Sequence, residues 1–403
     1  MNVSELACKI QNYAWGSRSF IAALQGRATP TELPEAELWI GAHAGAPAEV
    51  VEGESRQRLD QLIARKPLEL LGADVVRRFD GDLPFLLKVL AAAQPLSLQA
   101  HPNSEQARAG FDADEAAHIP LSAPQRSYKD CRHKPELIVA LTPFVALTGF
   151  RRVERTRQLF AELQSARLSP LLAPLAELPP EAALQALFER LMTSPRDVQQ
   201  ALVQSTLEGA AAALARGSEF EAELRWAARL NQLYPGDIGV VSSLLLNLVE
   251  LAPFEGLYLP AGNLHAYLDG SGVEIMAASD NVLRGGLTPK AVNVPELLRV
   301  LRFRELDVEP LRAKLGEAGE HVYSTSAAEF QLSYFTLEQP RTLATSGGPE
   351  LLLVSEGRAR IITESGALLL VSGSAAFVPA SIESITLEGE GRVFRARVAA
   401  DVA

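Results

Sequence analysis

The sequence has few of the features on which crosslinked, membrane-spanning or nucleic-acid-binding proteins depend. Its 403 residues include two cysteines, Cys8 and Cys131, too few for a disulfide framework. A formal net charge of −11 argues against nucleic acid or an anionic membrane surface as the main partner. The first residues show no basic flank followed by an apolar core, and the most apolar stretch, residues 238–251, is interrupted by polar side chains. We therefore expect a cytoplasmic protein with no membrane and no nucleic-acid partner.

The rest of the composition is that of a globular protein with more than one domain. Hydrophobic residues make up 47% of the chain and charged residues 22%. A chain of 403 residues is too long for one ordinary core, which gives two or three domains. Because the net charge is negative, any anionic substrate would have to be held by a local basic pocket.

The stretch from Leu96 to His101 reads as a strand with three polar side chains on one face. Successive side chains in a strand point to opposite faces, so Ser97, Gln99 and His101 share one side. The preceding run, residues 84–90, is apolar, which predicts that the polar face lines a cavity. A metal ion could satisfy such a buried polar row, although a hydrogen-bonded structural pair is the commoner explanation of a Gln-x-His pattern alone.

A second charged segment, residues 128–135, leads into an apolar strand that begins at Glu136. The carboxylate of Glu136 is either a solvated end residue or a group aimed at the same cavity as Gln99 and His101, and the local sequence favours neither. Pro135 holds the residue before it in an extended backbone conformation, which favours a defined direction for the Lys134 side chain.

A helical block separates two β-rich parts of the chain. From residue 151 to residue 235 the sequence is rich in Ala, Leu, Glu, Gln and Arg, with apolar residues such as Leu184, Leu187 and Phe188 at helical spacing. Strand-like sequence resumes after this block. It is therefore predicted to be an insertion between two parts of one sheet domain.

A third polar position follows the helical block. Residues 256–267 read as a strand, a tight Pro-Ala-Gly turn and a second strand with His265 near its start. This order is how a small β-barrel places a ligand residue on its inner wall, so a metal ligand is the better interpretation of His265. Farther along, Arg284 lies beside Gly285 and Gly286, which let the backbone approach a ligand closely, although a solvated turn is the alternative.

The end of the chain contains an internal echo of this strand pair. Residues 376–384 can be laid on residues 257–265 without a gap, and Ser384 falls where His265 stands. The predicted fold is mainly β with an α insertion, and contains two β-barrels of the jelly-roll type. Residues 1–150 and 236–315 are expected to form a discontinuous metal-binding domain, residues 151–235 the helical insertion, and residues 316–403 a C-terminal domain without metal.

Four segments, in this order along the chain, resemble the type I mannose-6-phosphate isomerases, zinc-dependent phosphomannose isomerases built on cupin barrels. The matching segments are residues 94–103, 128–136, 260–267 and 279–290. The sequence departs from the family at Ser104, where a lysine is often found. The resemblance implies one Zn²⁺ per chain and a sugar phosphate as substrate, and we expect a monomer. The implied zinc ligands are Gln99, His101, Glu136 and His265.

The resemblance also implies proton transfer between neighbouring carbons of an aldose and a ketose, through an enediol. Lys134 is a candidate base, Asp280 competes with it, and His133 could assist ring opening. Arg284 is expected to stabilise the enediolate, because charge develops there in the transition state. The remaining substrate-binding candidates are Trp15, Ser97, Tyr267, Glu274 and, for the phosphate, Lys290.

Two functions of other classes remain possible at this stage. A metal-binding cupin that senses sugars without turning them over would keep the four ligands but would not need Lys134, Asp280 and Arg284 together. An iron oxygenase of the cupin class fits less well, because a glutamine is among the ligands and no second histidine lies near His101. The joint presence of the candidate catalytic groups favours the isomerase.

Overall fold

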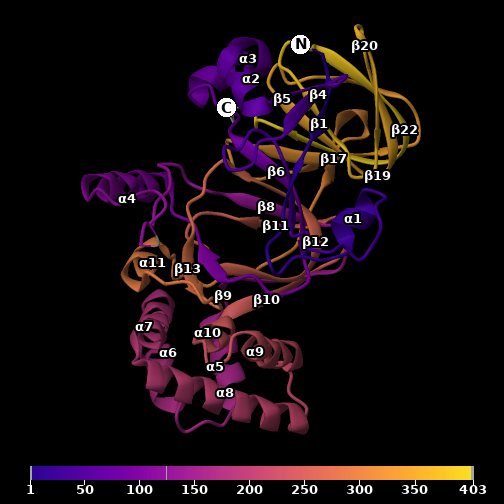
Figure 1. The fold of residues 1–403 in the computed structure, drawn as a ribbon. Coiled ribbons are helices and arrows are strands. Elements are labelled where there is room, and N and C mark those ends of the chain that lie inside the picture. The colour runs from indigo at the N-terminus through magenta and orange to yellow at the C-terminus, as the bar shows by residue number, and fades with distance from the viewer. Residues whose placement is uncertain (1, 124, 401–403) are drawn as a thin grey trace.

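The computed structural model describes residues 2–123 and 125–400, and contains two extended β-sheets and a helical block (Figure 1). The N-terminal sheet, as named here, lies in the middle of the molecule, between the helical block and the C-terminal sheet. Its strands are β2 (Lys9–Gln11), β3 (Glu37–Ile40), β6 (Phe85–Ala92), β7 (Leu98–Ala100), β8 (Glu136–Ala140), β9 (Phe144–Phe150), β10 (Leu246–Leu251), β11 (Glu255–Leu259), β12 (His265–Ala277), β13 (Leu283–Gly286) and β14 (Leu311–Arg312).

The C-terminal sheet is built mainly from the end of the chain, but its path includes three strands from the beginning. Its strands are β1 (Ser4–Ala7), β4 (Glu49–Glu52), β5 (Ser55–Arg58), β15 (Lys314–Leu315), β16 (His321–Tyr323), β17 (Gln331–Leu337), β18 (Arg341–Ala344), β19 (Glu350–Thr363), β20 (Gly366–Val371), β21 (Ala375–Val378) and β22 (Ser384–Arg397). Strands from the first 150 residues therefore occur in both sheets, and the division of the chain into domains stays a prediction.

Strand β12 joins the two halves of the N-terminal sheet and thereby forms the wall of the site. Its first part, from His265, pairs with β7 and β9, and its second part, from Gly270, pairs with β6 and β8. Gly270 has a φ of 115°, and a Cβ there would lie 2.6 Å from the carbonyl oxygen of Pro143. Only glycine fits this bend comfortably. The predicted fold class, mainly β with a helical insertion, is confirmed. The two predicted barrels are not closed, because the hydrogen-bonded strand order runs from β14 to β2 in one sheet and from β15 to β5 in the other without joining its ends.

The helical block packs against the apolar side of β7. Leu98 and Ala100 belong to the same core cluster as Leu187 and Phe188, from the insertion. The alternation predicted for this segment is thus present, because its apolar face meets the helices. The helices of the chain are α1 (Phe20–Leu24), α2 (Leu59–Arg65), α3 (Pro67–Arg78), α4 (Ser104–Ala116), α5 (Val153–Glu162), α6 (Pro174–Glu177), α7 (Pro180–Thr193), α8 (Arg196–Arg216), α9 (Glu221–Leu233), α10 (Gly239–Ser243) and α11 (Val294–Val300), with 3₁₀ turns at Ser169–Leu171 and Glu317–Gly319.

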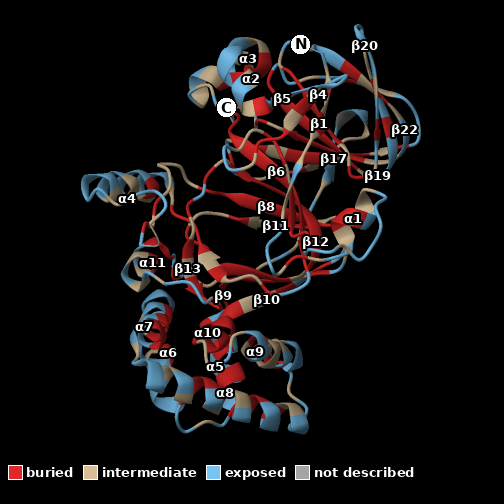
Figure 2. Cartoon of the chain, in the orientation of Figure 1, coloured by how far each residue is buried: buried red, intermediate tan, exposed pale blue. Residues whose placement is uncertain are grey.

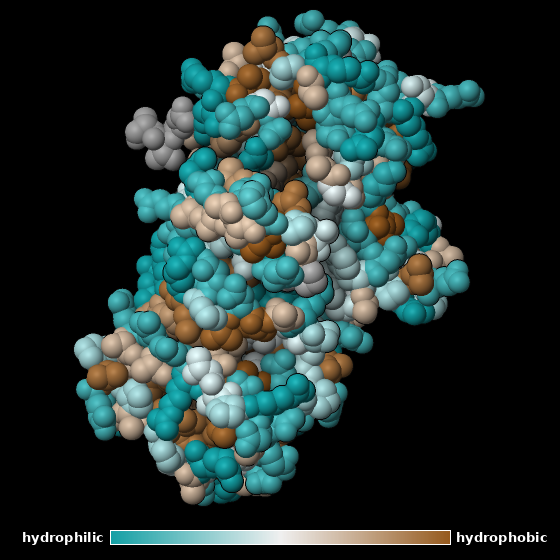
Figure 3. Space-filling model, turned by 60° about the vertical axis from the view of Figure 1, so that its left-hand side comes forward, coloured by the Kyte–Doolittle hydropathy of each residue, from teal (hydrophilic) through white to brown (hydrophobic). Residues whose placement is uncertain are grey.

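Buried residues run continuously through both sheets and the inner faces of the helices (Figure 2). The face shown in Figure 3 is mostly hydrophilic, with hydrophobic residues gathered in several separate patches. Among the described residues, no helix combines the length and the apolar character needed to cross a bilayer.

Candidate metal centre and active site

Three potential metal ligands from distant segments meet inside the N-terminal sheet. One ligand atom each from His101, Glu136 and His265 lies within 4.8 Å of the other two. The Nε2 atoms of His101 and His265 are each 3.4 Å from a different carboxylate oxygen of Glu136. Within the described part of the chain, both Nε2 atoms and Oε2 of Glu136 are buried without a hydrogen-bond partner. Such orphaned polar atoms are costly unless a further group satisfies them.

The hydrogen bonds of the two imidazole rings suit a cation between their Nε2 atoms. Nδ1 of His101 lies 2.7 Å from the carbonyl oxygen of Asn281, and Nδ1 of His265 lies 2.9 Å from that of Asn263. Each ring must donate its Nδ1 proton to that carbonyl, which leaves the Nε2 lone pair facing the centre. Burial lowers the pKa of His101 to about 4, so its ring is neutral at pH 7.

Glu136 supplies the negative charge of the centre. Burial raises its pKa, but Lys134 and His101 lower the pKa by more, so that it lies well below the ordinary value. The carboxylate is therefore ionised. Two imidazoles and one carboxylate are a common donor set for Zn²⁺.

Gln99 completes the polar wall beside these ligands. It pairs in register with His265 on β12, and directly opposed residues place their side chains on the same face of a sheet. Its carboxamide has no hydrogen-bond partner among the described residues, and it lines the cavity described next. Gln99 is thus available as a fourth ligand.

A cavity of about 470 Å³ opens beside the centre. Of the residues proposed from the sequence, its lining includes Trp15, Ser97, Gln99, Lys134, Glu136, Tyr267, Glu274, Arg284 and Lys290. Lys134 is buried, and its Nζ lies 3.0 Å from Oε1 of Glu136. The cavity therefore brings a lysine amine next to the candidate metal ligands.

Two cations at this cavity have no anionic partner. Within the described residues, neither Arg284 nor Lys290 has a carboxylate within ion-pair distance. The positive charge of Arg284 and partial burial lower the pKa of Lys290, and burial lowers that of Arg284. Both shifts indicate that positive charge is held here at a cost, which an anionic ligand would relieve.

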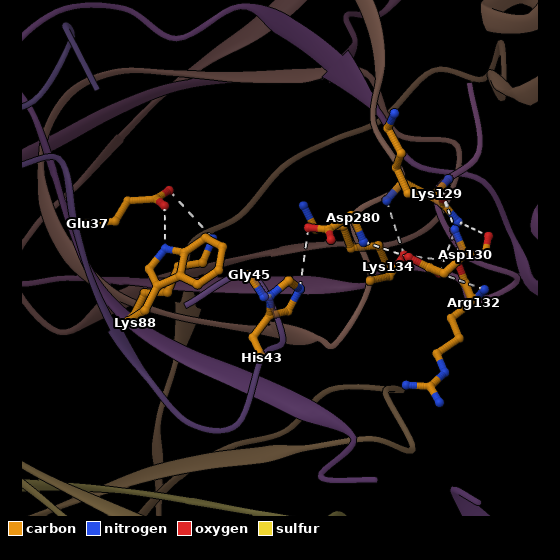
Figure 4. Close-up of polar contacts among 12 residues, drawn as sticks. Glu37, His43, Gly45, Lys88, Lys129, Asp130, Arg132, Lys134 and Asp280 are labelled. Carbon is orange, nitrogen blue, oxygen red and sulfur yellow. Dashed lines mark hydrogen bonds and ion pairs between the residues drawn. The ribbon is translucent and has the colours of Figure 1, made fainter. Parts of the chain in front are cut away.

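A chain of buried charges also lines the cavity. The Lys88 Nζ lies 3.2 Å from Glu274 and 3.5 Å from Glu37, and the Tyr267 hydroxyl donates a 2.8 Å hydrogen bond to Glu274. Figure 4 shows Lys88 and Glu37 next to each other. Sequence reasoning missed Lys88 and Glu37. The available signal was a lysine in the middle of an otherwise apolar strand, because lysine is rarely buried without a partner.

Two predicted catalytic residues lie away from this lining. Asp280 is exposed, and its carboxylate lies 3.4 Å from Nε2 of His43, as Figure 4 shows. Nε2 of His133 lies 2.6 Å from Glu329 and faces a different cavity of about 250 Å³. The structure thus gathers the metal ligands, Lys134, Arg284 and Lys290, but not Asp280 or His133.

This fold and this set of donor residues are those of a metal-binding cupin protein. Three family models match in succession: the catalytic domain of type I phosphomannose isomerase over residues 3–153, its helical insertion domain over 159–246, and the cupin domain of mannose-6-phosphate isomerase over 320–398. The chain belongs to the type I mannose-6-phosphate isomerase family.

Individual relatives agree with this assignment. The mannose-6-phosphate isomerase of Escherichia coli strain K12 is 36% identical over 398 residues, covering 98% of this chain and 99% of the relative. The human mannose-6-phosphate isomerase is 39% identical over 323 residues, covering 75% and 73%. A zinc-bound holo mannose 6-phosphate isomerase crystal structure aligns with a TM-score of 0.89 at 33% identity, covering 99% of this chain and 100% of that chain.

Proposed function

We propose that this chain is a zinc-dependent isomerase that interconverts mannose 6-phosphate and fructose 6-phosphate. The observation that carries the proposal is one cavity that joins the buried His101, Glu136 and His265 centre to Lys134 and to the unpaired cations Arg284 and Lys290. Relatives that share a third or more of the sequence over the full chain carry this activity in their names.

One zinc ion per chain would be held by His101, Glu136, His265 and Gln99. The unsatisfied Nε2 and carboxylate atoms fit this role, and two neutral imidazoles, one carboxylate and one carboxamide give the bound ion a net charge of +1. When bound, zinc supplies Lewis-acid stabilisation of negative charge on substrate oxygens.

Lys134 is the group best placed to move the proton. Isomerisation removes a proton from C2 of the aldose and returns it to C1. The Lys134 amine lines the cavity next to the ligands, whereas Asp280 is exposed and paired with His43. In its neutral form, Nζ of Lys134 accepts the C2 proton, and the resulting ammonium returns it to C1. The hydroxyl proton on the C2 oxygen moves to the C1 oxygen, which leaves a carbonyl at C2. His133 faces another cavity and is given no step.

Arg284 and Lys290 bind two different negative groups of the substrate, the enediolate and the phosphate. Arg284 is opposite Gln99 in register, and this position beside a candidate ligand supports a role for its guanidinium in stabilising the enediolate. Lys290 lies farther along the chain and binds the phosphate. Ser97, Trp15, Tyr267 and Glu274 line the remainder of the cavity and contact the sugar.

A coupled assay tests the proposal directly. Conversion of mannose 6-phosphate to fructose 6-phosphate should be abolished by a chelator and restored by added Zn²⁺. His265→Ala should lose both zinc and activity, while the control His321→Ala, in the C-terminal sheet, should keep both. Zinc binding without turnover would instead favour a sugar-sensing cupin, and active protein without bound metal would refute the zinc assignment.

The protein is further proposed to act as a monomer in the cytoplasm. The negative net charge and the two free thiols, Cys8 and Cys131, support this setting. Light scattering of the zinc-loaded protein at micromolar concentration should give the mass of one chain, and a stable dimer mass would contradict the monomer.

A further inference from the structure

The two loops beside the metal centre are joined by a buried polar cluster that the proposed function does not use. One loop, residues 128–135, leads into β8 and its ligand Glu136. The other, residues 278–282, connects β12 with β13. Figure 4 shows the first loop and Asp280 of the second side by side. Asp130 and Asn281 are the centre of the contact.

The carboxylate of Asp130 is surrounded by donors. Its Oδ1 accepts hydrogen bonds from the Ser279 hydroxyl at 2.9 Å, the Arg132 backbone N–H at 2.9 Å and Nδ2 of Asn281 at 3.2 Å. Its Oδ2 accepts from the Asp280 backbone N–H at 2.8 Å. Hydrogen bonds to an ionised carboxylate are stronger than neutral ones, so the two loops are firmly tied.

The Asn281 side chain makes the reciprocal contacts. It has no exposed surface. Its Oδ1 accepts from the backbone N–H groups of Lys129 at 2.7 Å and Asp130 at 3.3 Å. Its Nδ2 donates to the carbonyl oxygens of Asp130 at 2.8 Å and Arg132 at 2.9 Å. Every donor and acceptor of this carboxamide is therefore used, and only a carboxamide can do this.

The backbone of Asn281 carries the contact to the metal centre. Its carbonyl oxygen accepts the Nδ1 proton of His101, the contact that leaves Nε2 of His101 free. The other candidate histidine, His265, is held differently. It donates to Asn263, whose carboxamide is anchored on Thr148 and not on the loop before β8.

We infer that Asp130 and Asn281 form a clamp that positions the metal centre. The clamp holds the carbonyl that orients His101 and, through residues 129–132, fixes the start of the segment that carries Lys134 and Glu136. Asp130 and Asn281 are positioning residues, because neither is a candidate ligand of the metal ion and neither lines the substrate cavity. This inference rests on the proposed zinc site and adds residues that determine its geometry.

Asn281→Asp tests the clamp with almost no change in shape. A carboxylate cannot donate to the carbonyls of Asp130 and Arg132, and it would repel the carboxylate of Asp130. Zinc affinity of the metal-free protein, measured by competition with a chromophoric chelator, should fall about 10-fold to 100-fold, the usual effect of losing a partner of a metal-bound histidine. The visible absorption spectrum of the Co²⁺-loaded protein should also change, because it reports ligand geometry.

Asn293→Asp is the matched control. Asn293 caps α11 by accepting from the Glu296 backbone N–H, which an aspartate also does. Its Nδ2 donates to the Ser127 hydroxyl, and that hydroxyl can instead donate to an aspartate. This variant should retain wild-type zinc affinity and the wild-type Co²⁺ spectrum. If Asn281→Asp fails to fold, Ser279→Ala, which removes one donor to Asp130, should weaken zinc binding severalfold.

The outcomes separate the inference from the proposed function. Wild-type protein that binds no zinc would refute the proposed metal site. Wild-type protein that binds zinc, with folded clamp variants of equal zinc affinity and an unchanged Co²⁺ spectrum, would refute the clamp, even if the variants melted at lower temperature.

Discussion

At the scale of single residues, the buried ammonium of Lys88 depends on two carboxylates. It is 6% exposed in a strand whose other residues are also buried, and its ammonium lies between Glu37 and Glu274. Burial lowers the pKa of Lys88, but the two carboxylates raise it more, so its pKa lies above the ordinary value. Lys88 therefore stays charged at neutral pH, which makes it a partner for carboxylates and not a base.

Replacing Lys88 with methionine should destabilise the fold in a pH-dependent way. Breaking a buried ion pair costs about 3–5 kcal/mol. Burial raises the pKa of Glu274 and Lys88 opposes this, so the variant raises that pKa further. A carboxyl group whose folded pKa exceeds its unfolded value loses stabilisation as pH rises through the folded pKa. The penalty, measured by urea unfolding of metal-free protein, should thus be smaller at pH 5 than at pH 8.

An exposed ion pair provides the control for this experiment. Nζ of Lys9 lies 3.3 Å from Glu49 at the surface. Changing Lys9 to methionine should lower the free energy of unfolding by less than about 1 kcal/mol, with little pH dependence. A Lys88→Met penalty that is equally small, or that grows toward pH 5, would contradict the buried-charge explanation.

Substitutions of the two unpaired cations should separate binding from chemistry. Lys290→Ala should raise KM for the phosphorylated sugar about tenfold, since it removes one charge-assisted contact to a group that does not react. Arg284→Ala should lower kcat about 10²-fold or more, because its charge opposes one that develops in the transition state. Lys314→Ala, an exposed lysine on β15, should change neither constant. A kcat within a few-fold of wild type in Arg284→Ala would contradict its role.

The candidate metal ligands could be found from sequence because each lies in a short motif within or beside a strand. His101, Glu136 and His265 form one cluster and Gln99 lies opposite His265 in register, while their role as ligands stays a prediction. The places of Asp280 and His133 could not be predicted in this way. Both lie in loops, where the side-chain direction depends on tertiary contacts with His43 and Glu329, far away in the sequence.

At the scale of elements, the echo in the sequence corresponds to a repeated strand arrangement. Ser384 begins β22 as His265 begins β12. Glu350 pairs in register with Val378 on β21, as Glu136 pairs with Leu259 on β11. Where Glu136 faces two imidazoles, Glu350 instead receives a bidentate contact from Arg395, with bonds of 2.8 and 2.6 Å.

This arginine pair predicts a specific pattern of stabilities. Arg395→Leu would leave the unexposed Glu350 without its cation and should lower the free energy of unfolding by about 3–5 kcal/mol. The double variant with Glu350→Leu should recover much of that loss, because two apolar groups replace two charges. Zinc affinity should be unchanged in both. Urea unfolding and chelator competition measure these effects, and a double variant as unstable as the single one would contradict the compensation.

At the scale of the whole molecule, the helical insertion could be predicted, but the pairing of N-terminal strands with the C-terminal sheet could not. The insertion has a distinct composition and helical periodicity over a long stretch. By contrast, β1 lies between β21 and β4, and Ser4 on β1 is opposite Phe377 on β21. Pairing across such a sequence distance leaves no local pattern, because each strand only needs an apolar face.

The position of β1 predicts that a destabilising substitution in β1 loosens the C-terminal sheet. Leu6 on β1 is 4% exposed and belongs to a core cluster that also contains Phe377 and Leu351. Leu6→Ala should cost about 2–5 kcal/mol and speed amide hydrogen exchange in β21 and β19, whereas Glu5→Gln on the other face of β1 should not. Hydrogen exchange with mass spectrometry resolves these strands. If faster exchange stayed within β2 and β3 of the N-terminal sheet, the chain would behave as the simple division at residue 316 requires, and the coupling of the two sheets through β1 would be wrong.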